Sequence, residues 1–216
     1  MQKAWDKTDF KKQERKLYAP KEGRFSVVNV PPMSYLMIDG QGSPAGPEYM
    51  EAIQALYPVS YKIKFHSKLE LRRDYVVAPL SGLWWADDME SFKTGDKGQW
   101  QWTMMIRQPG WIDPALVTEI IEGLQAAGKT KNLHQLRLKT YAEGLSVQTM
   151  HIGPYADEGP TIAELHDDFL PANGLTENGH HHEIYLSDPR KTAPEKLKTI
   201  LRQPCRPIKQ QNRAVA

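Results

Sequence analysis

The stretch that decides the interpretation of this chain is Gly179-His180-His181-His182-Glu183-Ile184-Tyr185-Leu186-Ser187-Asp188-Pro189. Its pattern predicts a strand that ends at a Ser-Asp-Pro turn. Side chains alternate along a strand, so His181, Glu183 and Tyr185 share one face and His182, Ile184 and Leu186 share the other. Ile184 and Leu186 mark the second face as the packed one. A carboxylate beside aromatic groups is costly to desolvate without a partner, so Glu183 is a candidate site residue. The alternative is an ordinary surface glutamate on a solvated face.

The composition describes a soluble globular protein of one domain or of two small fused halves. The chain has 216 residues, of which 40% are hydrophobic and 25% are charged. A net charge of +2 argues against a dedicated nucleic-acid binder. We find no apolar run of roughly 18 residues and no signal peptide, so we expect no membrane partner. The single cysteine, Cys205, excludes an internal disulfide and favours a reducing, cytoplasmic location; we expect a buried or inert thiol.

The first half of the sequence predicts strands on either side of a helix, followed by a second helix. Residues 1–24 are Lys-rich and predict a polar N-terminal arm. Residues 25–38 are strand-like, a helix opens at Pro47 and ends before Pro58, and residues 60–74 give no clear assignment. Residues 74–85 and 99–107 predict two more strands, joined by a hairpin-type connection at residues 95–98. A further helix begins at Asp113-Pro114, with Asp113 as its N-cap, and ends near Gly128.

The second half repeats this order. Residues 136–141 and 145–152 flank Ala142-Glu143-Gly144 and predict a hairpin. A helix opens at Pro160, the strand of Glu183 follows, and a last helix begins at about Thr192. The repetition predicts an internal duplication of residues 25–110 and 133–208, followed by a tail at 209–216. Two similar sheets would then lie side by side with a groove between them, and such junctions are common sites for small molecules.

The tryptophans indicate a second candidate feature. Four of the six, Trp84, Trp85, Trp100 and Trp102, lie close together in the sequence. Adjacent strand residues face opposite sides, so one of Trp84 and Trp85 is expected in the core and the other at a groove. The competing interpretation is that all four serve core packing. Large flat rings also suit planar or cationic ligands through stacking and cation–π contact.

We expect no metal and no cofactor. In the run His180-His181-His182, only His180 and His182 point the same way, and no Cys or carboxylate cluster supports them. The sequence also contains no Walker A, GxGxxG, GxSxG or CxxC motif.

Four segments in this order resemble the GyrI-like small-molecule-binding family. They are Pro79-Leu80-Ser81-Gly82-Leu83-Trp84-Trp85, residues 100–109 from Trp100 to Pro109, Met150-His151-Ile152-Gly153-Pro154-Tyr155, and residues 181–190 from His181 to Arg190. Within the family, the chain resembles the stand-alone branch that includes cyclopropanoid cyclopropyl hydrolases. The resemblance covers roughly residues 25–208.

The resemblance implies an α+β fold of two strand–helix–strand–strand modules, related by a pseudo-two-fold, with a central ligand groove between two sheets. Family members fused to transcription regulators bind amphipathic and cationic drugs, and Glu183 matches the Glu on their groove floor. The hydrolase branch has an aromatic cage. The candidates for it here, with His181 beside them on the face of Glu183, are Trp84, Trp85, Trp100, Trp102, Tyr141, Tyr155 and Tyr185. This chain departs from the regulators because residues 1–24 are too short for a helix-turn-helix, and Ser81 stands where an acidic residue is expected.

The expected function is binding and detoxification of planar hydrophobic xenobiotics, including hydrolytic opening of an activated cyclopropane. Glu183 would orient or deprotonate the attacking water. The hydroxyl of Tyr155 or Tyr185 would donate to the developing oxyanion. Two alternatives remain open, namely a drug-sequestering protein without catalysis and a protein that modulates DNA gyrase by direct interaction.

Overall fold

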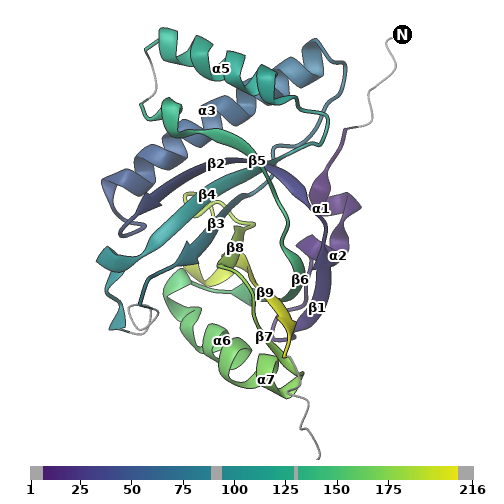
Figure 1. Cartoon of the computed structure of the whole chain (residues 1–216), viewed down its shortest axis with the longest axis vertical. Coiled ribbons are helices and arrows are strands. Elements are labelled where there is room, and N and C mark those ends of the chain that lie inside the picture. The colour runs from purple at the N-terminus through teal and green to yellow at the C-terminus, as the bar shows by residue number, and fades with distance from the viewer. Residues whose placement is uncertain (1–6, 89–93, 129–130, 209–216) are drawn as a thin grey trace, which may run out of the picture.

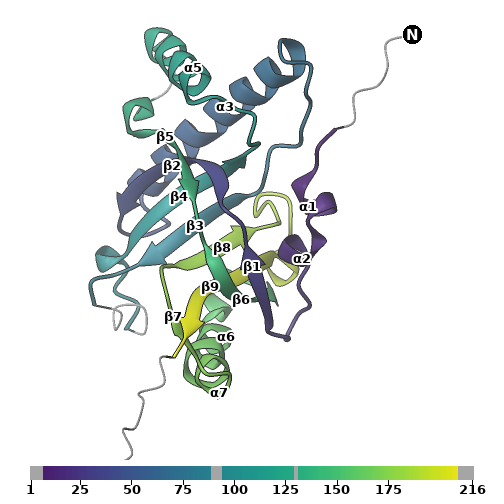
Figure 2. The ribbon, with the colours of Figure 1, turned by 45° about the vertical axis from the view of Figure 1, so that its right-hand side comes forward.

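The computed structural model describes residues 7–88, 94–128 and 131–208, so the predicted tail at 209–216 lies outside the described residues. Its centre is a nine-stranded sheet in the order β1-β6-β9-β8-β3-β4-β2-β5, with β7 paired to β9 (Figures 1 and 2). Neighbouring strands run antiparallel. The strands are β1 Ser26–Val30, β2 Met33–Gln41, β3 Leu80–Trp85, β4 Gln101–Gln108, β5 Arg137–Tyr141, β6 Gly144–Ile152, β7 Leu175–Glu177, β8 His181–Tyr185 and β9 Lys198–Pro207.

The helices lie at the two ends of the sheet and along one side of it (Figure 1). In chain order they are α1 Phe10–Gln13, α2 Arg15–Tyr18, α3 Pro47–Leu69, α5 Pro114–Ala126, α6 Gly159–Ala163, a π-helical segment Glu164–Phe169, and α7 Leu170–Ala172. Figure 1 shows α3 and α5 at one end and α6 and α7 at the other, with the sheet between them. In this described part of the chain, no helix combines the length and the apolar character needed to cross a membrane.

The two halves of the chain use the same strand order and join directly. The order is β2–β4–β3 in the first half and β6–β9–β8 in the second. Because β3 pairs with β8, with Gly82 opposite Glu183, the strands form one continuous sheet instead of two sheets side by side. The outer strands cross over, since β1 pairs with β6 and β5 pairs with β2.

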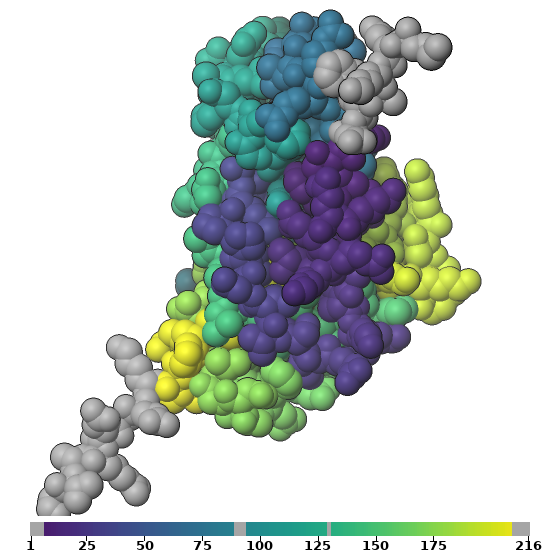
Figure 3. All heavy atoms as spheres, turned by 90° about the vertical axis from the view of Figure 1, so that its right-hand side faces the viewer, coloured from purple at the N-terminus to yellow at the C-terminus, as the bar shows by residue number. Residues whose placement is uncertain are grey.

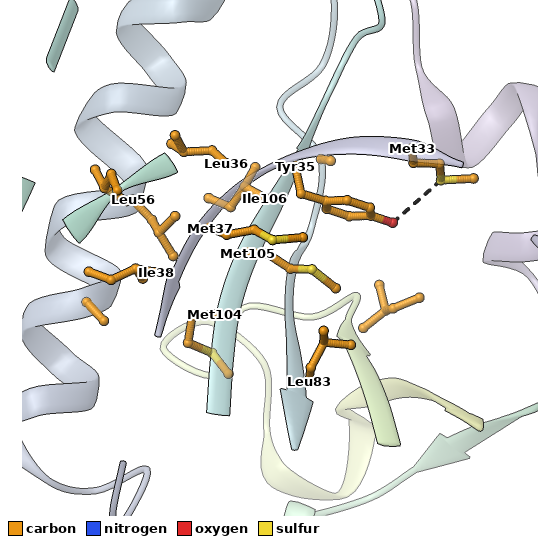
Figure 4. Packing of buried hydrophobic residues seen from close by; sticks show 14 of the residues in the cluster. Met33, Tyr35, Leu36, Met37, Ile38, Leu56, Leu83, Met104, Met105 and Ile106 are labelled. Carbon is orange, nitrogen blue, oxygen red and sulfur yellow. Dashed lines mark hydrogen bonds between the residues drawn. The ribbon is translucent and has the colours of Figure 1, made fainter. Parts of the chain in front are cut away.

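One face of the sheet, here called the helical face, packs against α3 at one end and against α6, the π-helical segment and α7 at the other. Figure 4 shows Leu36 and Ile38 of β2 beside Leu56 of α3. At the other end, Val147 and Cys205 form a buried cluster with Leu165, Leu170 and Leu175. Strand register puts Glu183 on this same face, opposite Leu201 of β9 and between the two helical layers.

The opposite face, here called the arm face, is covered by the N-terminal residues. The guanidinium of Arg107 donates to both carboxylate oxygens of Glu14 at 2.6 and 2.7 Å and lies 4.0 Å from the ring centroid of Phe10. Arg202 donates to the backbone oxygen of Leu17 at 2.8 Å. Figure 3 shows this N-terminal segment spread over one side of the molecule. These contacts make residues 7–24 part of the folded domain.

A buried ionic group lies beneath the arm. The carboxylate of Glu143 accepts from Arg202 Nη1 at 3.1 Å and contacts His182 Nδ1 at 3.0 Å, while Arg202 Nε donates to Gln148 Oε1 at 2.9 Å. Burial alone would raise the pKa of Glu143, but His182 and Arg202 lower it to about 2. Every charge in this group has a partner, which is the condition for burying charges without a large penalty.

The prediction that the helix ends before Pro58 is wrong. Helix α3 continues through Pro58 to Leu69 and also takes up much of the unassigned segment at 60–74. The apolar stripe continues past the proline, because Leu56, Val59 and Ile63 are all fully buried. A proline inside a helix costs about 3 kcal/mol, and burial of this stripe offsets that cost.

Two further predictions are wrong. Strands β5 and β6 do not pair with each other as a hairpin; β5 pairs with β2, and β6 pairs with β1 and β9. Glu143 in their connection is instead buried against Arg202. The predicted helix from Thr192 is a short 3-10 turn at Pro194–Lys196 followed by strand β9. Because β9 is buried on both faces, its apolar residues do not alternate, and the spacing of Leu197, Ile200 and Leu201 matches that of a helical stripe.

Candidate functional site

The candidate site is built on the seam between β3 and β8, on the helical face. Register places Gly82 of β3 directly opposite Glu183 of β8. A Cβ atom on Gly82 would lie 2.1 Å from the Cε atom of Met104 and 2.9 Å from Nε1 of Trp84. The lack of a side chain at position 82 therefore allows Trp84 and Met104 to pack close to the carboxylate.

The carboxylate of Glu183 is held by a chain of two hydrogen bonds. The hydroxyl of Tyr185 donates to Glu183 Oε2 at 2.8 Å, and Trp84 Nε1 donates to the Tyr185 oxygen at 3.0 Å. Only 15% of the Glu183 side chain is exposed. Glu183 is therefore an enclosed and oriented carboxylate, which excludes the alternative of an ordinary surface glutamate.

Aromatic rings surround this chain of hydrogen bonds. Tyr49, from the first turn of α3, stacks on Trp84 with centroids 6.1 Å apart and meets Trp102 edge-on at 5.5 Å. Tyr155 meets Tyr185 edge-on at 5.6 Å. Trp84 and Trp102 are buried, whereas Tyr155 is 40% exposed. Tyr155 therefore forms the solvent-facing rim of the site and Trp84 its inner wall.

Trp100 extends the aromatic wall. Its ring lies edge-on to Trp84 at 5.9 Å, and Lys97 Nζ lies 5.5 Å from its centroid. Three of the four clustered tryptophans, Trp84, Trp100 and Trp102, thus contact one another or share Tyr49 as a neighbour.

A second carboxyl group lies next to Glu183. Glu158, just before α6, is 4% exposed, and its Oε1 atom has no hydrogen-bond partner among the described residues. Burial raises the pKa of Glu158 to about 9, with a further contribution from the charge of Glu183, and only the Thr199 hydroxyl acts to lower it. Burial also raises the pKa of Glu183 to about 7, against the hydrogen bond from Tyr185. Near neutral pH, Glu158 is the protonated member of the pair and Glu183 the member that can ionise.

The remaining predicted site residues separate into two groups. His181 is on the helical face, with its Nε2 atom 4.0 Å from Glu183 Oε1. Trp85 points to the arm face, where it stacks on His180 at 4.2 Å and donates to Gln101 Oε1 at 3.1 Å. Tyr141 also lies on the arm face, where burial and the charge of Glu143 raise its pKa to about 12. The fold therefore brings His181 to Glu183 and keeps Trp85 and Tyr141 away.

Two residues of this site were missed by sequence reasoning, namely Tyr49 and Glu158. Tyr49 follows Pro47-Glu48 in the first turn of α3, and Glu158 precedes Gly159-Pro160 at the start of α6. Each lies where the chain enters a helix, two residues after Pro47 in the first half and two residues before Pro160 in the second. These proline-marked helix starts are the signal in the sequence that could have drawn attention to them.

The His run does not converge on a metal. His180 stacks on Trp85 and His182 is buried against Glu143. Within residues 7–88, 94–128 and 131–208, no three His, Cys, Asp or Glu side chains are grouped so that they could hold a metal ion.

Solved structures similar to this chain include three from Listeria innocua. A comparison with curated proteins finds no match. An uncharacterized conserved protein from Listeria innocua is 41% identical, with a TM-score of 0.85, over 93% of this chain and 100% of that one. Two structures from Listeria innocua that are described as hydrolases are each 40% identical over the same shares of the two chains, with TM-scores of 0.80 and 0.83.

The family comparison covers most of the domain. Residues 24–205 match the GyrI-like small molecule binding domain, which includes all nine strands except the end of β9. The buried carboxylate, the aromatic enclosure and this match lead to one conclusion: the chain belongs to the GyrI-like small-molecule-binding family.

Proposed function

We propose that this protein binds planar hydrophobic xenobiotics and opens an activated cyclopropane in them by hydrolysis. The observation that carries the proposal is Glu183, an oriented carboxylate enclosed by aromatic rings and next to a second buried carboxyl group. The two relatives described as hydrolases, each 40% identical to this chain, support hydrolytic chemistry.

Glu183 has the properties of a general base. Its pKa, raised by burial to about 7, matches the neutral pH at which a catalytic base is most effective. The hydrogen bond from Tyr185 occupies Oε2 and leaves Oε1 for a water molecule. The sequence suggested that the Tyr185 hydroxyl donates to the developing oxyanion. Because this hydroxyl already donates to Glu183, we assign Tyr185 the role of positioning the Glu183 carboxylate.

Glu158 has the properties of the matching acid. Its pKa, raised to about 9, keeps it protonated at neutral pH, and two neighbouring carboxyls with separated pKa values commonly divide the acid and base roles. The Tyr155 hydroxyl, on the partly exposed rim, is the remaining candidate donor to the developing oxyanion.

The proposed substrate is a cyclopropane conjugated to a dienone, and water opens its strained ring. Glu183 takes a proton from water as the water oxygen bonds to a ring carbon, and the strained carbon–carbon bond breaks. The electron pair of that bond moves to the carbonyl oxygen, which takes a proton from Glu158 and becomes a phenol. Tyr49, Trp84 and Trp100 hold the flat substrate in the geometry for attack.

The test is turnover of a synthetic spirocyclopropyl cyclohexadienone, followed by the absorbance of the phenol product. We expect Glu183→Gln to remain folded, because the amide is nearly isosteric and still accepts from Tyr185. Its turnover should fall by roughly 100-fold or more, the usual contribution of a positioned general base. Glu195→Gln, at an exposed position of the same half, is the matched control and should behave as wild type.

Two outcomes would contradict the proposal. Equal turnover by Glu183→Gln and wild type would remove Glu183 from the chemistry. Saturable quenching of tryptophan fluorescence by the dienone without any phenol product would instead identify a drug-sequestering protein, the non-catalytic alternative.

A further inference from the structure

A buried imidazole lies beside Glu183, on the side away from the Tyr185 hydrogen bond. The side chain of His181 is 10% exposed, and neither of its ring nitrogens has a hydrogen-bond partner among the described residues. Its Nε2 atom is 4.0 Å from Glu183 Oε1, the oxygen that Tyr185 leaves open. Buried polar atoms without partners are uncommon and costly, so two of them on one ring beside a candidate base require an explanation.

A second imidazole continues the path toward solvent. The ring of His166 lies 6.3 Å from that of His181, centroid to centroid, and its Nδ1 atom is hydrogen-bonded to Glu177 Oε1. The exposed fraction rises along this series, from 10% at His181 to 18% at His166 and 52% at Glu177. His166 is presented by the π-helical segment Glu164–Phe169, and such widened turns are frequent at functional sites.

We propose that His181 and His166 form a proton relay that connects Glu183 to solvent at Glu177. After each turnover Glu183 releases through this relay the proton it took from water, and Glu158 takes up a proton to replace the one it gave to the phenol. This inference rests on the proposed function. It assigns His181 a role in moving protons, in addition to the ligand contact expected from its position in the sequence.

The relay gives the proton on Glu183 a path that does not cross the ligand. A flat ligand held against Tyr49, Trp84 and Tyr155 covers the open side of Glu183, so the relay lets Glu183 lose its proton while the ligand or product is still bound. A neutral imidazole accepts a proton at one nitrogen and releases one from the other. Each transfer takes place between neighbouring side chains, because His181 Nε2 lies 4.0 Å from Glu183 Oε1 and the rings of His181 and His166 lie 6.3 Å apart between their centroids.

The surroundings of His181 suit a carrier that does not retain the proton. Burial is the largest of the effects that lower the pKa of His181 to about 3; His166 and His182 act in the same direction, and Gln203 and Glu177 act against it. With Glu183, these are the titratable and polar groups near its ring on β7, β8, β9 and the π-helical segment. His181 is therefore neutral at rest and passes a proton on to His166, whose Nδ1 atom is hydrogen-bonded to Glu177.

The relay is tested with His166→Ala and the spirocyclopropyl cyclohexadienone in weak buffer. A single turnover starts from ionised Glu183 and should proceed at the wild-type rate. Steady-state turnover should fall by roughly 10- to 100-fold, on the scale of general acid–base catalysis, and added free imidazole should restore it. His134→Ala, at an exposed position outside the path, should match wild type with and without imidazole.

His181→Phe provides a second variant, with circular dichroism as the check on folding, and should show the same steady-state loss. Steady-state turnover of His166→Ala equal to wild type, or a loss that imidazole does not restore, would overturn the relay. These results differ from failure of the proposed function, in which Glu183→Gln itself would turn over the dienone as well as wild type.

Discussion

Three buried glutamates show how neighbours decide the ionisation of one residue type. Glu143 faces Arg202 and His182, which lower its pKa to about 2 and keep it charged. Glu183 and Glu158 face hydroxyls, aromatic rings and each other, so burial raises the pKa of both. The two faces of one sheet therefore carry a buried ion group on one side and a buried carboxyl pair with raised pKa values on the other.

The pH dependence of stability follows from the sign of each shift. The pKa of Glu183 rises from 4.5 to about 7 on folding, so the folded state keeps a proton that the unfolded state loses between these values. Stability should fall as pH rises through this window. Glu183→Gln removes this effect and should be more stable than wild type above pH 7 by about 3 kcal/mol, at about 1.4 kcal/mol per pKa unit.

Urea unfolding of both proteins from pH 4.5 to 8 measures this difference. If the unfolding free energies of wild type and Glu183→Gln differed by a constant amount across that range, the pKa of Glu183 would not be raised in the folded state. Glu143 acts in the opposite direction, because its stabilisation is present above its unfolded pKa of 4.5 and is lost as pH falls toward about 2.

Gly40 gives a packing prediction at the residue scale. A Cβ atom there would lie 2.1, 2.4 and 2.6 Å from three ring atoms of Trp102, which is fully buried and cannot move aside. Gly40→Ala should destabilise the protein by about 1–3 kcal/mol through overpacking. Gly123→Ala, with open space around it in α5, should stabilise by about 0.5–1 kcal/mol. Thermal unfolding compares the two, and a neutral Gly40→Ala would show that this contact is not as tight as the structure has it.

At the scale of the element, strand β3 divides its two tryptophans between the two faces. Trp84→Phe keeps most of the ring but removes the hydrogen bond to Tyr185, so it should reduce turnover of the dienone and cost about 1 kcal/mol of stability. Trp85→Phe removes only the bond to Gln101 on the arm face and should leave turnover unchanged. Kinetics and unfolding of both variants test this, and equal losses of turnover would place Trp85 in the site.

The sequence alone predicted those features of the fold that depend only on local rules. Alternation in residues 181–186 predicted the faces of β8 correctly, and Asp113-Pro114 predicted the start of α5, where Asp113 accepts from the Ala115 amide at 2.7 Å. It was insufficient where tertiary burial prevails, as at Pro58 and in β9. Tyr49 and Glu158 were missed because only the three-dimensional fold brings residues so distant in sequence to Glu183.

At the scale of the whole molecule, the N-terminal arm holds the face opposite the site. Glu14→Ala would leave Arg107, whose side chain is 12% exposed, without its carboxylate partner. We expect a loss of about 2 kcal/mol, since an unpaired buried charge is costly. Turnover by the folded protein should not change, because the arm and the site lie on opposite faces.

Glu22→Ala, an exposed glutamate in the same segment, is the control for chemical denaturation and should be neutral. A neutral Glu14→Ala would mean that the arm does not stabilise the domain through Arg107. Loss of turnover in the folded variant would mean that the two faces are coupled.

The proposal that Glu183 and Glu158 act as a base and an acid in one enclosed site predicts the shape of the pH profile of kcat/KM for the dienone. We predict a bell, with a rising limb near pH 7 from Glu183 and a falling limb near pH 9 from Glu158, the two limbs belonging to the pair. Glu183→Gln should lack the rising limb. A wild-type profile that rises near the ordinary carboxyl value of about 4.3, or a rising limb that persists in Glu183→Gln, would contradict the account.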